Sequence, residues 1–239
     1  MEEPRRRPRA GCLAVAALLL GYSATTACTG SSVQPAAPSP GLGTAPPTTP
    51  APRPTTRTPG TGQTTAGIKL IAAPRPDGSF DVTEDVLLPQ ATDILPLQVP
   101  ASGEHLPGMM ARTTPRVTNL KVLAGNQTVP LENTTVTGSD YIPLTTAANR
   151  IRLTYRLSGS TVRSSPSEST RAGAALRPLT ASAGSTMPTD LTVTSGLLNA
   201  VCPLLPETRC AVGDPPQLAI RSGIPADKAL VVVQLDLPR

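Results

Sequence analysis

The chain has 239 residues, a formal net charge of +5 and very few aromatic side chains: three Tyr, one Phe and no Trp. Four of the five surplus charges belong to an N-terminal arginine cluster and to two arginines of a Pro/Thr-rich segment, so only about one remains for the rest of the chain. That part has neither a strongly basic balance nor aromatic rings on which bases could stack. The composition therefore argues against nucleic-acid binding.

Residues 1–27 have the pattern of a secretory signal peptide. The charged start MEEPRRRPRAG is followed by the apolar run CLAVAALLLGY and then by small residues up to Ala27. A transmembrane helix needs about 20 apolar residues, which this run does not provide. The residues after Arg6-Arg7 lack the apolar pair of a twin-arginine signal, so we favour general secretion.

Cys28 is the candidate site of lipidation. The sequence Thr26-Ala27-Cys28 resembles the lipobox of bacterial lipoproteins, in which the cysteine thiol is diacylated before the signal peptide is cleaved. Thr25 departs from this pattern, because a Leu is usual there. Two acyl chains such as palmitate would anchor the protein stably to a membrane. Two alternatives stay open: ordinary cleavage that releases a soluble protein, and an unmodified thiol, which is unusual in an exported protein.

Residues 28–66 are predicted to be a disordered linker that is anchored at its first residue. Pro, Thr, Ala, Gly and Ser dominate this segment, and it contains no acidic and no aromatic residue. Such a composition buries too little apolar surface to offset the entropy of ordering. The prolines favour extended polyproline II, which would hold a domain away from a membrane surface.

Residues 67–239 are predicted to form one all-β domain, an antiparallel β-sandwich. Short runs of Val, Leu, Ile and Ala alternate with turn residues, and no helical period is sustained. Residues 149–157 alternate between apolar and polar side chains, as expected of a strand with one buried face. Asp77-Gly78 and Gly125-Asn126 are predicted hairpin turns. The expected strands are 68–73, 79–88, 115–124, 149–159, 172–181, 190–198, 217–222 and 229–237.

Cys202 and Cys210 are predicted to form a disulfide. Cys12 would leave with the signal peptide and Cys28 is the lipidation candidate, so these two cysteines remain, enclosing PLLPETR in an oxidising compartment. A zinc site would need further ligands, and His105 is the only histidine. The spacing also differs from the Cys-x-x-Cys of redox-active pairs.

No catalytic residue, metal site or cofactor is predicted. A hydrolase would use His105 as its base, but the segment GEHLPG reads as an exposed loop and no Gly-x-Ser-x-Gly elbow occurs. The acidic run DGSFDVTED lacks the glycine and the closing Glu of an EF-hand calcium loop. Within it, Glu84 would share a strand face with apolar residues. We expect Glu84 at the sheet rim or paired with an arginine, because burying an isolated carboxylate is costly.

Arg150, Arg152 and Arg156, with Arg163 nearby, form a basic stripe on one strand face. They are the candidate contacts with anionic envelope polymers or phospholipid head groups. The alternative interpretation is an ordinary solvated outer face.

Four segments of the domain, DGSFDVTEDVLL, RLTYRLSGSTV, ALRPL and MPTDLTVT, resemble a family of uncharacterised bacterial envelope proteins. The resemblance implies an exported β-sandwich outside the membrane and supplies no catalytic residue to carry over. Many members continue into membrane helices and carry Trp near the equivalent of ALRPL. This chain departs from them by ending at Arg239 without such a helix and by having no Trp.

The sequence therefore predicts a non-enzymatic lipoprotein, a β-sandwich on a disordered tether at the extracytoplasmic face of the cell membrane. Its expected partners are the membrane, through the lipid anchor, and another envelope protein or a cell-wall polymer. Two alternatives remain. One is an envelope hydrolase with His105 as base, and the other is a soluble secreted ligand-binding module in which Cys28 is unmodified.

Overall fold

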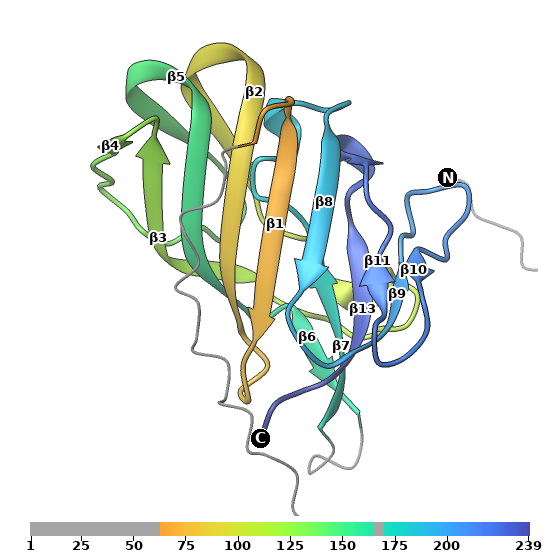
Figure 1. The fold of residues 1–239 in the computed structure, drawn as a ribbon. Coiled ribbons are helices and arrows are strands. Elements are labelled where there is room, and N and C mark those ends of the chain that lie inside the picture. The colour runs from red at the N-terminus through yellow and green to blue at the C-terminus, as the bar shows by residue number, and fades with distance from the viewer. Residues whose placement is uncertain (1–62, 165–169) are drawn as a thin grey trace, which may run out of the picture. The chain divides into compact units, whose positions relative to one another are not determined.

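Strands with alternating apolar side chains build two facing β-sheets (Figure 1). The computed structural model describes residues 63–164 and 170–239, and within these ranges its only helices are three short 3-10 turns. None of the helices in these ranges is long and apolar enough to span a membrane. The predicted β-sandwich is confirmed. The signal peptide, Cys28 and most of the linker lie outside the described residues, so those assignments stay predictions.

The larger sheet has seven strands in the order β12-β8-β1-β2-β5-β3-β4. Neighbouring strands are antiparallel, except that β1 and β8 run parallel. Its strands are β1 (Gly67–Pro74), β2 (Phe80–Gln98), β3 (Arg116–Ala124), β4 (Gln127–Thr128), β5 (Ser139–Ser158), β8 (Pro188–Val193) and β12 (Ile224–Pro225).

The smaller sheet has four strands in the order β6-β7-β13-β9, and a separate two-stranded ribbon pairs β10 with β11. These strands are β6 (Thr161–Arg163), β7 (Arg171–Leu176), β9 (Leu197–Val201), β10 (Ala211–Val212), β11 (Ala219–Ile220) and β13 (Val231–Asp236). The 3-10 helices are η1 (Gly103–His105), η2 (Ala181–Ala183) and η3 (Ala226–Lys228).

The inner faces of the two sheets share one core, and a smaller cluster lies behind the smaller sheet. On β13, Val233 and Leu235 are buried in the shared core. The preceding residue, Val232, points to the opposite face of the sheet. There it is covered by Leu106 and Met109, which follow η1. The chain thus covers part of the outer face of its smaller sheet, whereas polar residues of the larger sheet remain exposed on the opposite side of the sandwich.

The strand pattern of residues 149–157 is confirmed on β5. Ile151, Leu153, Tyr155 and Leu157 are buried in the core, and the residues between them lie on the outer face. Burial of one such aliphatic side chain stabilises a fold by about 1.5–3 kcal/mol, so this alternation specifies which face of β5 turns inward.

Both predicted hairpin turns are present. Gly78 connects β1 to β2 with a φ of 83°, and Gly125 connects β3 to β4 with a φ of 60°, a region that favours glycine. In the first turn, Asp77 Oδ1 accepts hydrogen bonds from the Ser79 backbone N–H at 2.9 Å and from its hydroxyl at 2.6 Å. These bonds, led by that of the hydroxyl, lower the pKa of Asp77.

Residues 190–198 do not form the single strand that the sequence predicts. β8 ends at Val193 and β9 begins at Leu197, and the two strands belong to different sheets. Gly196 lies between them with a φ of 71°, and a Cβ there would clash with the Asp236 carbonyl oxygen. The prediction was wrong because the apolar pattern continues through this glycine, where the backbone changes direction.

Other strand ends also differ from prediction. The strand expected at 172–181 ends at Leu176, and the one at 217–222 shortens to two residues of β11. β2 and β5 are longer than expected because they continue as a pair, to Gln98 on β2 and from Ser139 on β5.

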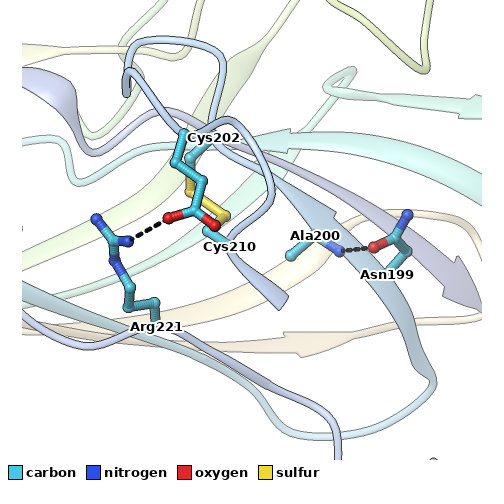
Figure 2. The surroundings of a disulfide bond; sticks show 6 residues. Asn199, Ala200, Cys202, Cys210 and Arg221 are labelled. Atoms are coloured by element: carbon cyan, nitrogen blue, oxygen red, sulfur yellow. Dashed lines mark hydrogen bonds and ion pairs between the residues drawn. A yellow bond between two sulfur atoms is a disulfide. The ribbon is translucent and has the colours of Figure 1, made fainter. Parts of the chain in front are cut away.

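The predicted disulfide joins Cys202 to Cys210, with the Cα atoms 5.8 Å apart (Figure 2). Both cysteines are buried, and the Cys202 backbone N–H donates to the Thr208 carbonyl at 2.7 Å across the loop. The bridge therefore closes a short loop directly after β9, at the edge of the smaller sheet.

Replacing both cysteines, Cys202→Ala with Cys210→Ala, should lower the free energy of unfolding by about 2–3 kcal/mol, because the open loop gains entropy in the unfolded chain. Urea unfolding followed by circular dichroism measures this loss. Dithiothreitol should destabilise the wild type by a similar amount and leave the double variant unchanged. Equal stability of the oxidised and reduced wild type would contradict the prediction.

Candidate functional site

A row of alternating charges crosses the outer face of the larger sheet. In the strand register, Lys69 on β1 lies opposite Asp190 on β8 and Asp85 on β2, and Asp85 lies opposite Arg152 on β5. We call these four residues the charge row. Opposite charges on facing positions of neighbouring strands attract one another, so the positive and negative charges of the row largely cancel.

Two of the predicted stripe arginines are paired with carboxylates. Arg152 Nε lies 2.5 Å from Asp85 Oδ1, and Arg156 Nε lies 3.3 Å from Asp81 Oδ1. Asp81 also binds Arg75, whose Nη1 lies 2.7 Å from Asp81 Oδ2, and this hydrogen bond is the main cause of the lowered Asp81 pKa. The hydrogen bond to Asp85 raises the pKa of Arg152. Much of the stripe's positive charge is therefore neutralised locally.

The other two stripe arginines donate to backbone carbonyls. Arg163 donates to the carbonyl oxygen of Pro76, and Arg150 Nη2 donates to that of Gln63 at 3.1 Å. Neither contact cancels a charge. The structure thus divides the stripe: Arg152 and Arg156 have carboxylate partners, and Arg150 and Arg163 have none among the described residues.

A hollow of about 670 Å³ lies over the charge row. Besides the four residues of the row, its lining includes Arg150, the apolar side chains of Leu87 and Leu123, and the side-chain amide of Asn126. Three cations and two carboxylates line it, which leaves one net positive charge. The hollow has the size of a small-molecule site and offers ion pairs, hydrogen bonds and short apolar walls to a ligand.

Sequence reasoning found only part of this site. It singled out the arginines and the acidic run that contains Asp85, but it missed Lys69 and Asp190. These two meet because β1 and β8 pair in parallel. No local pattern in the sequence indicates that pairing.

His105 ends η1 and is exposed. Within residues 63–164 and 170–239 it has no hydrogen bond and no ion pair. The same part of the chain holds no group of three or more His, Cys, Asp or Glu side chains that could bind a metal ion. Among the described residues, no hydrogen bond or ion pair therefore joins His105 to a nucleophile or to a carboxylate.

Glu84 is fully buried in the first half of β2, so the prediction of a rim position or an arginine partner is wrong. Its carboxylate accepts four hydrogen bonds, all from neutral groups. Oε2 accepts from the Leu179 backbone N–H at 2.9 Å and from the Tyr155 hydroxyl at 3.1 Å. Oε1 accepts from the Thr180 backbone N–H at 3.0 Å and from the Thr180 hydroxyl.

Three of these hydrogen bonds join β2 of the larger sheet to the segment that follows β7 of the smaller sheet. Leu179 and Thr180 lie between β7 of the smaller sheet and η2, and the Leu179 carbonyl also accepts from the Gln98 backbone N–H at 2.8 Å. Because Glu84 has no exposed surface, it cannot touch a ligand. We therefore assign Glu84 a structural role and exclude it from the binding site.

Burial raises the pKa of Glu84 above its ordinary value of 4.5, and the hydrogen bonds from Thr180, Leu179 and Tyr155 oppose that shift. Burial and the neighbouring carboxylate also raise the pKa of Tyr155 well above its ordinary value. The charge state of this network therefore depends on pH.

Comparison with known proteins assigns no family. No family model matches the sequence, and no curated protein matches it. Among solved structures, the chain is similar to part of an aminopeptidase N family protein from Idiomarina loihiensis, with a TM-score of 0.41 and 11% identity. The match covers 71% of this chain and only 29% of that protein. A likeness this distant indicates neither a family nor an activity.

Removing the Glu84 carboxylate should destabilise the domain strongly. Glu84→Ala leaves four buried donors without an acceptor and should cost at least about 3 kcal/mol. Glu84→Gln keeps one acceptor oxygen but turns an amide N–H₂ toward a donor, so it should cost about 1–3 kcal/mol. The matched control is Asp85→Asn, the next residue on β2, whose exposed ion pair is worth at most about 1 kcal/mol. Equal urea unfolding curves for Glu84→Ala and Asp85→Asn would refute the structural role.

The stability difference between the wild type and Glu84→Gln should depend on pH. Because the folded-state pKa of Glu84 is raised, the folded protein holds this proton more tightly than the unfolded chain does. The stability of the wild type relative to Glu84→Gln should therefore be greatest below pH 4.5, the ordinary pKa of a glutamate. It should fall as the pH rises through the folded-state pKa of Glu84. The fall is at most about 1.4 kcal/mol per pH unit. Urea unfolding at several pH values measures it, and a difference that rises with pH contradicts the prediction.

Proposed function

We propose that this protein is a lipid-anchored, non-catalytic binding module at the extracytoplasmic face of a bacterial cell membrane. The sandwich presents the outer face of its larger sheet to another envelope component. The observation that carries the binding role is the hollow over the charge row, which is open to solvent and lined by charged, amide and apolar side chains.

The arrangement of the hollow supports binding more than catalysis. Catalysis by general acid and base needs a titratable group within hydrogen-bond reach of a nucleophile or a reacting atom. Asp85 in the hollow binds Arg152, and Asp190 Oδ1 accepts a hydrogen bond from the Gly223 backbone N–H at 2.9 Å. His105 does not line the hollow. Both carboxylates of the hollow are therefore already engaged by hydrogen bonds within the domain.

The anchoring role is carried by the N-terminal sequence. A signal peptide that ends directly before Cys28, followed by a Pro/Thr-rich segment, is the arrangement that a tethered domain requires. The partner contacted by the domain is an envelope protein or a cell-wall polymer. If Cys28 is not acylated, the same domain is a soluble secreted ligand-binding module.

Intact mass of the full chain, expressed in a bacterium and extracted from its membranes with detergent, tests the anchor. The mature protein should begin at Cys28 and carry the added mass of its acyl groups, because diacylation precedes cleavage. Cys28→Ala should abolish the added mass and move the protein to the soluble fraction. Cys12→Ala, a cysteine replacement within the signal peptide, should change neither. A wild-type mature chain without acyl mass contradicts the lipoprotein proposal.

A further inference from the structure

Arg150 is the surplus cation of the hollow. Its facing residue on β2 is Leu87, so no carboxylate stands directly opposite it. The diagonal position on β2 is Asp85, which already binds Arg152 at 2.5 Å. A guanidinium has five N–H donors, and the contact from Arg150 to the Gln63 carbonyl uses one Nη. Donors with full positive charge therefore remain at the edge of the hollow.

The rest of the hollow favours an anion at this position. The charge row alternates in sign across four strands and is balanced within itself, with two cations and two carboxylates. Arg150 accounts for the one net positive charge of the lining. A carboxylate or phosphate oxygen pair matches the planar fork of arginine, which binds such groups through two parallel hydrogen bonds.

The size and walls of the hollow indicate what carries the anion. A volume of about 670 Å³ is much larger than a single carboxylate or phosphate group needs. Leu87 and Leu123 provide apolar walls, and the Asn126 side chain provides an amide for hydrogen bonds. The anionic group is therefore expected to be part of a larger molecule that lies across the outer face of the sheet.

We propose that the hollow is an anion-recognition site in which Arg150 binds a carboxylate or phosphodiester group of an envelope polymer. That the ligand is an envelope polymer rests on the proposed function. The anion site itself is argued from the described side chains alone. It also narrows the four-arginine stripe to one residue, because Arg152 and Arg156 are paired with Asp85 and Asp81, and Arg163 does not line the hollow.

The test is a titration of the full-length mature protein, ¹⁵N-labelled and in detergent, with dimethyl phosphate and, separately, with acetate. Backbone amides of Gly125 and Asn126, which line the hollow, should shift with saturation, while those of Gly78 and Gly159 should not. Raising the ionic strength should weaken binding, because salt screens the charge. The probe that binds more tightly identifies the source as phosphodiester or carboxylate.

Arg150→Gln should lower the association constant at least about tenfold, because a hydrogen bond to a charged group contributes about 1.5–3 kcal/mol. The matched control is Arg156→Gln, which removes the same charge from the same strand face, about 20 Å along β5. It should change binding less than about twofold, since that distance exceeds the screening length in 0.1 M salt. Folding of both variants is checked by their amide spectra.

Two outcomes would overturn the anion site: no saturable shift at Gly125 and Asn126 with either probe, or equal weakening by Arg150→Gln and Arg156→Gln. The second would mean that the surface attracts anions only through its overall charge. The acyl mass of the same preparation is recorded independently. Saturable binding without acylation would contradict the lipid anchor alone, and acylation without saturable binding would contradict the anion site alone.

Discussion

One buried carboxylate, that of Glu84, joins β2 of the larger sheet to the segment that follows β7 of the smaller sheet. Moving a charged carboxylate from water into a protein core is costly, and Glu84 offsets this cost with four hydrogen bonds. Three of them come from Leu179 and Thr180, in the segment that leaves the smaller sheet. An apolar side chain would fill the same space without fixing where that segment lies. The network thus specifies one arrangement of the core, because each donor loses its partner in any other arrangement.

The outer face of the larger sheet, by contrast, carries exposed charged side chains that the core does not need. Exposed ion pairs such as Arg152 with Asp85 contribute little to stability, so folding places few constraints on the arrangement of charges there. The smaller sheet has no such freedom, because Leu106 and Met109 cover part of its outer face. The two faces of the sandwich are therefore unequal, and the polar hollow lies on the open one.

Local features of this fold follow from the sequence, and non-local ones do not. The alternation in β5, the Asp77-Gly78 turn and the short cysteine loop each depend on neighbouring residues, and all three were predicted correctly. The donors to Glu84 come from a distant segment and include two backbone N–H groups, which no residue type reveals. The hollow is non-local in the same way, because its charge row exists only through the register of four strands.

The position of β1 also has a mechanical consequence. This strand begins at Gly67, where the chain enters the sandwich, and it is an interior strand held by β2 along all eight residues and by β8 along five. Inter-strand hydrogen bonds run across the strand direction, so a pull on the preceding residues loads both ladders in shear. An edge strand pulled from its end would instead be peeled away one bond at a time. The strand β1 is thus suited to bear a tension that is applied through the residues preceding it.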